Sequence, residues 1–191
     1  MRKKDCFSTE PAVGNVGRRA ILGIGLAGLA SMAAGPAFAA LNKPRERKLS
    51  LHNLHTGETI RTTFWADGVF QTAALRDIDF VLRDYRTDEV TEIDPQLLVL
   101  LHRITQTTGV DAPFEVISGY RSPKTNAALA SASSGVAKKS LHMQGMAIDV
   151  RLPGLRLRHL RDTAKRLQSG GVGYYPKSDF VHIDTGPVRY W

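Results

Sequence analysis

The segment from Ser140 to Asp149 places a histidine and an aspartate where they could act together. The histidine, His142, stands in a stretch of loop composition, and Asp149 follows within a short apolar run. Gly145 lies between them, and glycine permits the left-handed backbone of a sharp turn. A loop histidine can therefore fold back toward an aspartate on the strand that follows.

A second histidine, His182, occupies the centre of a short strand predicted for residues 180–184. Side chains alternate along a strand, so the apolar Val181 and Ile183 face one way, toward a core. His182 and Asp184 then point together from the opposite face. This strand therefore aims a histidine and a carboxylate away from the core residues that flank them.

Two histidines and one carboxylate form the protein half of a catalytic zinc site. Zinc prefers nitrogen and oxygen ligands in tetrahedral geometry, and a catalytic site keeps the fourth position open for water. Binding lowers the pKa of that water to about 7, which produces a nucleophile near neutral pH. A histidine seven residues before an aspartate is a common spacing, so by itself it leaves an ordinary structural role open for both residues.

These residues also fall into a longer pattern, Ser-x-His-x-x-Gly-x-Ala-x-Asp, which spans residues 140–149 and is followed by the strand histidine. In this pattern the chain resembles the zinc peptidases related to D-alanyl-D-alanine carboxypeptidases, lysostaphin and the hedgehog domain. Within that group it is similar to the murein endopeptidases. The other matching segments are spread over nearly the whole length of the chain after residue 40: 53–58, 118–122 with Asn126, 136–140, 170–176 and 180–187, with Trp191 at the end.

The resemblance implies a role for each of these residues. His142, Asp149 and His182 would hold one zinc ion per chain. Arg121 would bind the substrate carbonyl or carboxylate and stabilise the developing oxyanion, a role that suits a guanidinium because it stays charged and forms paired hydrogen bonds. Ser140 would brace the loop and contact the substrate. The alternative for Arg121 is a surface arginine in a turn before a helix.

The general base is the point at which this sequence departs from the better-known relatives. They place a histidine two residues before the last ligand or a glutamate three before it, and these positions here hold Phe180 and Asp179. Asp179 has a shorter reach than glutamate. Asp184 shares a strand face with His182 and could contact the attacking water or orient the ligand. We favour Asp184 over Asp179, with a plain solvated or hydrogen-bonded carboxylate as the alternative for each.

The function implied by the resemblance is hydrolysis of peptide cross-links in peptidoglycan at meso-diaminopimelate junctions. Two alternatives stay open: D,D-carboxypeptidase action on the same polymer, and a zinc-stabilised module that binds the wall without cutting it. Residues 1–39 hold five of the 26 basic and two of the 18 acidic residues, which leaves 21 against 16, a net charge of +5, in the rest. This charge suits an anionic polymer such as the cell wall, and no nucleic-acid partner is expected.

Residues 1–39 have the composition of an export signal, which leaves 40–191 as one peptidase domain. Arg18-Arg19 precedes an uncharged apolar run at 20–34, and residues 37–39 form a cleavage site of the A-x-A type. The arginine pair resembles a twin-arginine signal, and the apolar run is short for a membrane-spanning helix, which takes roughly 20 residues. We therefore expect a periplasmic protein without stable membrane insertion after cleavage; an uncleaved anchor is the alternative.

The only cysteine, Cys6, lies in this leader, so the exported domain is expected to contain no disulfide, no thiol nucleophile and no thiolate ligand. The remaining histidines of the domain are expected to be structural. His102 and His159 fall on predicted helices as surface residues, and His52 and His55 lie on a strand and its turn, where their spacing does not converge on one metal.

The predicted fold is α+β, with a mainly antiparallel sheet and flanking helices, as in the hedgehog and D,D-peptidase group. Apolar periodicity, caps and turn residues predict the elements. The helices are expected at about 71–85, 95–108, 123–131 and 157–167, and the strands at 49–54, 59–65, 114–117, 147–151, 172–175 and 180–184.

Overall fold

The computed structural model describes residues 45–191 except 133, 134 and 136, all within one compact unit that spans residues 42–191. The leader predicted for residues 1–39 lies outside the described residues and stays a prediction. The strands are β1 (Glu46–Asn53), β2 (Thr59–Ala66), β3 (Val69–Phe70), β4 (Phe114–Ser118), β5 (Ala147–Arg151), β6 (Gly171–Tyr175), β7 (Phe180–Asp184) and β8 (Arg189–Tyr190). The helices are α2 (Thr72–Val81), α3 (Pro95–Thr108), α4 (Pro123–Ala132), α5 (Leu157–Leu167) and the short 3₁₀ helix η1 (Leu141–Gln144).

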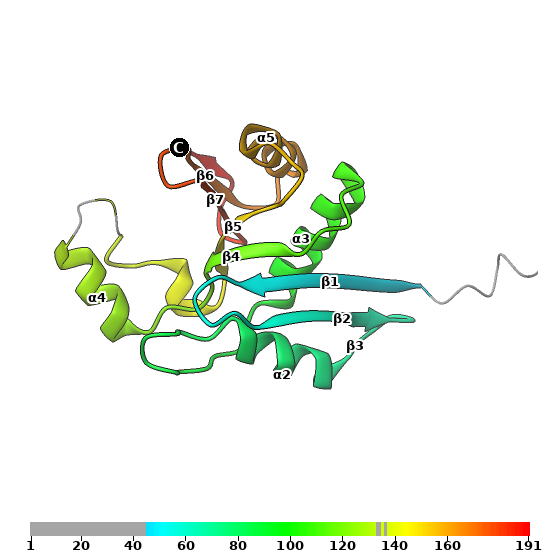
Figure 1. Ribbon diagram of the computed structural model, residues 1–191, viewed down its shortest axis with the longest axis horizontal. Helices are drawn as coiled ribbons and strands as arrows, with labels where there is room; N and C mark the ends of the chain where they lie inside the picture. Colours follow the sequence, from blue (N-terminus) through cyan, green and yellow to red (C-terminus); the bar gives the residue numbers. More distant parts are fainter. Residues whose placement is uncertain (1–44, 133–134, 136) are drawn as a thin grey trace, which may run out of the picture. The chain divides into compact units, whose positions relative to one another are not determined.

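The strands form one sheet in the order β3-β2-β1-β4-β5-β7-β6-β8, as Figure 1 shows in part. The pairs β1–β4 and β6–β8 are parallel, and the other neighbours are antiparallel. The prediction of an α+β fold with a mainly antiparallel sheet is therefore confirmed.

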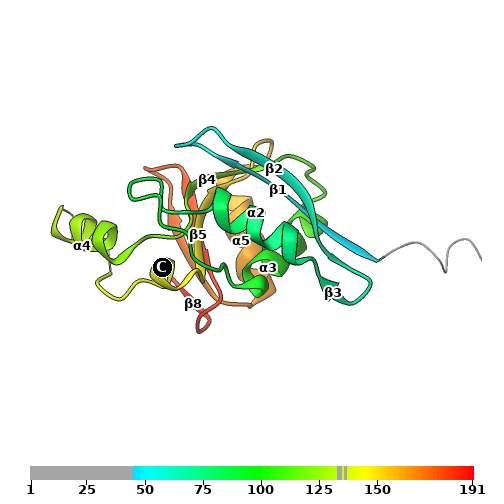
Figure 2. The same cartoon turned by 90° about the horizontal axis from the view of Figure 1, so that it is seen from below.

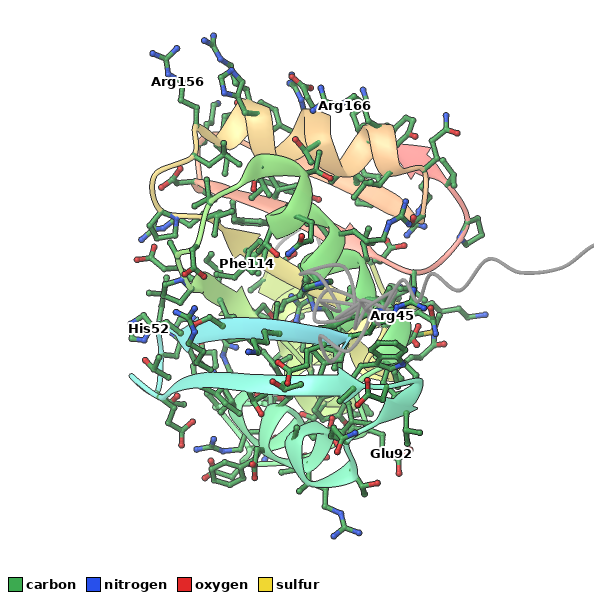
Figure 3. The ribbon with its side chains drawn as sticks, turned by 90° about the vertical axis from the view of Figure 1, so that its right-hand side faces the viewer. Arg45, His52, Glu92, Phe114, Arg156 and Arg166 are labelled. Atoms are coloured by element: carbon green, nitrogen blue, oxygen red, sulfur yellow. The ribbon has the colours of Figure 1, made fainter. Side chains whose placement is uncertain are left out.

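Helices α2, α3 and α5 pack against the strands and cover the apolar face of the sheet (Figure 2). Phe114, fully buried, lies between strands and helices, whereas Arg156 and Arg166 project outward from the α5 region (Figure 3). The apolar stripe of α5, with Leu160 and Ala164 at its centre, belongs to the same core as the strands below it. In the described part of the chain, no helix is long and apolar enough to cross a membrane.

Helix α3 begins and ends at the predicted residues. The Asp94 carboxylate accepts a hydrogen bond from the N–H of Gln96 at 2.9 Å, and Pro95 occupies the first turn, where its missing N–H costs nothing. Gly109 ends the helix in the left-handed conformation, with φ of 68°. The predicted helix at 71–85 is too long, because α2 ends at Val81.

The chain leaves α2 early because Asp84 draws the following residues into a turn. The backbone carbonyl of Asp84 accepts the N–H groups of Thr87 and Asp88, and its buried carboxylate accepts those of Arg86 and Ser122. The last of these contacts ties the turn to the start of α4. The end of α2 therefore depends on a contact with a segment far along the chain.

Candidate metal centre

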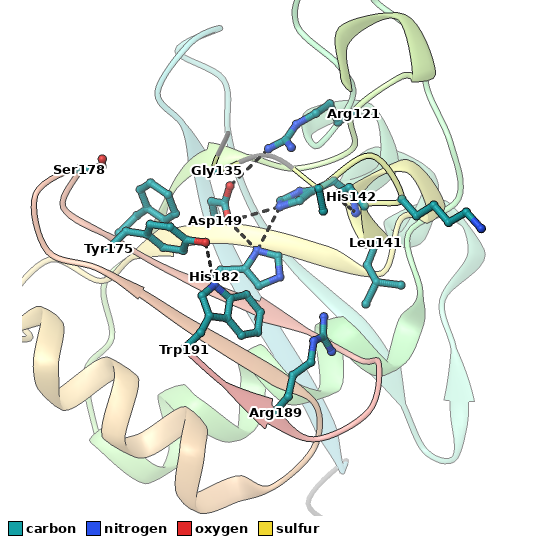
Figure 4. Close-up of a pocket in the computed structure, with 14 residues that line it drawn as sticks. Arg121, Gly135, Leu141, His142, Asp149, Tyr175, Ser178, His182, Arg189 and Trp191 are labelled. Carbon is teal, nitrogen blue, oxygen red and sulfur yellow. Dashed lines mark hydrogen bonds and ion pairs between the residues drawn. The ribbon is translucent and has the colours of Figure 1, made fainter. Parts of the chain in front are cut away.

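His142, Asp149 and His182 converge on one point. Asp149 on β5 and His182 on β7 are cross-strand partners, so their side chains leave the same face of the sheet next to each other. His142 comes from η1, which lies over this face. The Nε2 atom of His142 lies 3.2 Å from Nδ1 of His182 and 3.3 Å from Oδ1 of Asp149, and the last two atoms are 2.8 Å apart (Figure 4).

The loop that presents His142 is fixed at both ends. At its start, the hydroxyl of Ser140 accepts the N–H of His142 at 3.3 Å and so caps η1. At its end, Gly145 adopts φ of 66°, and a Cβ atom there would lie 2.2 Å from the carbonyl oxygen of Glu92. Only glycine fits both conditions. Ser140 is thus placed where it braces the loop, and it also lines the pocket beside His142.

Each histidine is oriented by a second hydrogen bond on the far side of its ring. Nδ1 of His142 lies 2.7 Å from the carbonyl oxygen of Gly119, and Nε2 of His182 lies 3.0 Å from Oδ2 of Asp184. Because both partners are acceptors, these nitrogens carry the protons. The lone pairs of the other two nitrogens then point at each other and at Asp149, an arrangement that calls for a positive charge between them.

The donor set fits a metal ion such as zinc. Tetrahedral zinc with nitrogen and oxygen ligands needs donor atoms separated by about 3.3 Å, close to two of the three separations in this site. In the metal-free protein, burial favours neutral His182, but its hydrogen bonds with Asp149 and Asp184 outweigh burial and raise its pKa to about 9. Burial would raise the pKa of Asp149, yet the two histidines hold it well below its usual range. The field around these groups therefore favours a cation.

Asp184 is a fully buried carboxylate whose hydrogen-bonding capacity is already used. Besides His182 it accepts the backbone N–H groups of Gly171 at 2.9 Å and Gly186 at 2.8 Å, and the guanidinium of Arg189 lies 2.7 Å away. Burial would raise its pKa, but these bonds, led by that with His182, lower it to about 2. Of the two predicted roles, this arrangement supports orientation of His182 over proton transfer.

Asp179, the other candidate base, does not enter the pocket. It stands in the turn before β7 with φ of 55°, and its side chain, 62% exposed, pairs with Arg151 at 2.9 Å. Arg151 in turn pairs with Glu115 on the neighbouring strand. Among the described residues that line the pocket, Asp149 is the one carboxylate.

Arg121 lies beside the three converging side chains and is largely buried. One of its terminal nitrogens is 3.2 Å from the hydroxyl of Ser118 and 3.6 Å from Oδ2 of Asp149, and the other is 3.5 Å from Asn126. Burial lowers its pKa, and the charge of Asp149 opposes that shift. Its Nε–H has no hydrogen-bond partner in the part of the chain that the structure describes. A buried donor without a partner is rare in folded proteins, which sets this arginine apart from one that only stabilises a turn.

The pocket around these residues has a volume of about 350 Å³. Its lining includes Tyr175, Arg189 and Trp191, which sequence analysis did not single out as site residues. The signal that could have found them is the alternation Gly171-Val172-Gly173 in β6, which removes side chains from one face of the strand and leaves room there. The indole of Trp191 fills that room (Figure 4).

Three of the remaining histidines have partners elsewhere, and His159 is exposed on α5, as predicted. The ring of His55 stacks on Tyr85 with centroids 3.8 Å apart, and His52 pairs with the hydroxyl of Thr59. Nδ1 of His102 lies 2.9 Å from the carbonyl oxygen of Lys48. Within the described residues, the one group of three or more histidine, cysteine or acidic side chains placed to share a metal ion is His142, Asp149 and His182.

We expect Asp184→Asn to weaken metal binding by about 10–100-fold, the effect typical of losing a partner that orients a ligand. The amide would place an N–H or a neutral oxygen where His182, Arg189 and two backbone groups need a carboxylate. Titration against a chromogenic chelator measures the affinity. Asp179→Asn is the matched control and should bind metal like the wild type. Equal affinities in both variants, with activity lost only in Asp184→Asn, would instead give Asp184 a role in proton transfer.

Comparison with known proteins places this site in a family. The model of the family described as "Peptidoglycan L,D-endopeptidase MepK" matches residues 41–191. Over 175 residues the chain is 45% identical to the peptidoglycan L,D-endopeptidase MepK of Escherichia coli strain K12, an alignment that covers 91% of this chain and 96% of the relative. It is 43% identical over 155 residues to the probable peptidoglycan L,D-endopeptidase MepK of Haemophilus influenzae, with 81% and 83% covered. The resemblance seen in the motifs is confirmed.

Proposed function

Since the chain belongs to the peptidoglycan L,D-endopeptidase MepK family, we propose that it is a zinc-dependent enzyme that hydrolyses peptide cross-links of peptidoglycan at meso-diaminopimelate junctions. The family identifies the protein as a peptidoglycan endopeptidase and, by its class, as a metallopeptidase. The choice of zinc and of the junction is the proposal. The observation that carries the choice of zinc is the convergence of two imidazole lone pairs and one carboxylate in an open pocket.

His142, Asp149 and His182 would hold the ion, through Nε2, Oδ1 and Nδ1 respectively. A zinc ion bound there supplies a Lewis acid and lowers the pKa of a coordinated water to about 7. Gly119 and Asp184 keep both imidazoles in the tautomers that the ion requires. The fit of this donor set supports zinc, which favours nitrogen and oxygen ligands, over calcium and magnesium, which favour oxygen alone.

Arg121 would act on the substrate directly. Its guanidinium lines the pocket beside Asp149, where its N–H groups would donate to the carbonyl oxygen of the scissile peptide. This hydrogen bond would strengthen as negative charge develops on that oxygen. The carboxylate of Asp149, the hydroxyl of Ser118 and the amide of Asn126 hold the guanidinium in place, so the group is already oriented before the substrate arrives.

The described pocket offers no carboxylate other than Asp149 to accept a proton from the attacking water. Asp149 would hold the ion through Oδ1, and its Oδ2 faces Arg121. Despite its burial, the two histidines keep the pKa of Asp149 well below its usual range, so it is a weak proton acceptor. Asp184 contributes by holding His182 rather than by moving a proton. We therefore propose the orienting role for Asp184, which is one of the two roles predicted for it from the sequence.

The proposed location follows from the substrate. Peptidoglycan lies outside the cytoplasmic membrane, so the enzyme must be exported. We propose that residues 1–39 act as a twin-arginine signal and that residues 40–191 function in the periplasm. The composition of the leader supports this, since an arginine pair precedes a short uncharged run and an A-x-A site.

Digestion of purified sacculi by residues 40–191 tests the proposal. We expect new muropeptides from cleavage between two diaminopimelate residues, complete loss of cleavage after treatment with a chelator, and recovery when zinc is returned. The products are separated by chromatography and identified by mass. Release of terminal D-alanine alone would identify a D,D-carboxypeptidase, and binding to sacculi without any cleavage would identify a wall-binding module. Either result contradicts the proposal.

A further inference from the structure

Three aromatic side chains line one side of the pocket, and we call them the aromatic wall: Tyr175, Phe180 and Trp191. The rings of Tyr175 and Phe180 are stacked, with centroids 4.6 Å apart and an angle of 21° between their planes. The indole N–H of Trp191 donates a hydrogen bond to the hydroxyl of Tyr175 at 2.7 Å. Figure 4 shows Trp191 and Tyr175 side by side next to His182.

Trp191 is held against the metal centre by backbone contacts. Its N–H donates to the carbonyl of Val172 and its oxygen accepts the N–H of Tyr174, which anchors it along β6. Gly173 lies between these two residues and is the cross-strand partner of His182. A Cβ atom at Gly173 would lie 2.6 Å from the indole, so the missing side chain is what allows the ring to lie there. The indole centroid is 5.3 Å from that of His182.

The wall offers an apolar surface to a ligand. Trp191 is 50% exposed although it is anchored at its backbone and its ring N–H is satisfied. An aromatic ring that is held in place, exposed and part of a concave site is a typical contact surface for an apolar group. Arg121 and the wall lie on opposite sides of the three converging side chains (Figure 4). The side of the wall also holds a cation, since the guanidinium of Arg189 lies 5.1 Å from the centroid of the indole.

Such a pocket suits a residue that combines an aliphatic arm with charged ends. The side chain of diaminopimelate is a run of methylene groups that ends in a second amino-acid centre. We propose that the aromatic wall is a subsite that binds the methylene arm of the residue beside the scissile bond, with Trp191 as its main contact. This inference rests on the proposed function and adds the element that selects the substrate.

Kinetics with chemically defined substrates test the inference. The first substrate is a dimer joined by the natural cross-link between two diaminopimelate residues. In one analogue, the residue that gives the scissile carbonyl has its free arm shortened to a methyl group. In the other, the residue that gives the scissile nitrogen has its arm shortened by two methylene groups and keeps the amino group that forms the cross-link. We expect wild-type kcat/KM to fall by about tenfold or more for at least one analogue, as for other pockets that lose methylene contacts.

The preference for the natural substrate should nearly disappear in Trp191→Ala, because the variant has lost the surface that recognises the arm. Trp191→Phe keeps an aromatic face and should keep most of the preference. Tyr190→Ala is the matched control, and this variant should behave like the wild type. Tyr190 is a neighbouring aromatic residue of similar exposure, but its ring packs on Lys165 instead of the metal centre. Metal content is measured for every variant.

The ratio of kcat/KM for the natural substrate to kcat/KM for each analogue separates a role of Trp191 in recognition from a purely structural role. If Trp191 only supports His182, Trp191→Ala lowers kcat/KM for all three substrates by the same factor, and the preference survives unchanged. That result would overturn the inference and leave the proposed function intact. A wild-type enzyme without preference among the three substrates would overturn it as well. Failure of the wild type to cut the natural cross-link would instead contradict the proposed function, and the subsite with it.

Discussion

His182→Ala and His142→Ala are each expected to remove most of the bound zinc and to lower kcat/KM by at least about 1,000-fold, because two remaining ligands do not hold the ion that supplies the nucleophile. The wild type should contain about one zinc per chain, since one such ligand set is present in the described residues. The loss should be large at either position because both nitrogens face the same point, 3.2 Å apart. Elemental analysis measures metal content beside the rate.

A histidine outside the site provides the control for these variants. His102→Ala removes an imidazole that contacts the carbonyl of Lys48 near β1, away from the three predicted ligands, and should keep both zinc and activity. Circular dichroism checks that each variant is folded. Full zinc content in both His142→Ala and His182→Ala would show that the ion binds elsewhere and would remove the basis of the proposed mechanism.

Arg121→Ala is expected to lower kcat by about 10²–10³-fold while zinc content stays normal, the effect typical of losing one donor to a developing oxyanion. Arg121 is not among the three ligands, but its guanidinium is 3.6 Å from Asp149 and its Nε–H lacks a protein partner in the described residues. Arg121→Lys keeps the charge without the planar pair of donors, so it should recover only part of the rate. Steady-state kinetics on a defined cross-linked dimer measure kcat and KM separately.

The matched control is Arg151→Ala, which removes an arginine of β5 that pairs with Glu115 and Asp179 outside the pocket. It should leave kcat within a few-fold of the wild type. An unchanged kcat in Arg121→Ala would reduce Arg121 to a turn residue whose backbone N–H supports the carbonyl of His142. A rise in KM with an unchanged kcat would indicate that Arg121 binds the substrate and the transition state equally, which also contradicts its proposed role.

Local sequence determined most of the secondary structure and the residues that form the metal centre. Period-two alternation in β7 sets Val181 and Ile183 toward the core and His182 toward the site, whatever the rest of the chain does. The cap at Asp94 and the glycine at 109 act within a few residues, so the bounds of α3 follow from the sequence. The turn at Gly145 was expected, but the short helix η1 before it was not, since a loop was predicted there. The two short strands β3 and β8 were missed, because two residues carry no periodic signal.

The environments of Asp184 and Asp179 depend on contacts that only the tertiary structure provides. Asp184 and Asp179 flank the same strand, and strand parity alone left both as candidate bases. In the fold, Gly171 and Arg189 approach Asp184 from β6 and β8 and occupy its oxygens, whereas the left-handed backbone at Asp179 turns its side chain to Arg151. These contacts join residues of different segments, 5 to 28 positions apart, and the alternation within one strand does not encode them.

The position of Trp191 at the side of the pocket also depends on the tertiary structure. Its indole reaches the site because β8 adds in parallel to β6 and because Gly173 leaves space opposite His182. A tryptophan and a glycine eighteen positions apart give no periodic signal in the sequence. The types of the candidate metal ligands and the strand faces on which they lie are thus properties of the local sequence. The hydrogen bonds around these ligands and the aromatic wall beside them exist only once the sheet has brought β5, β6, β7 and β8 together.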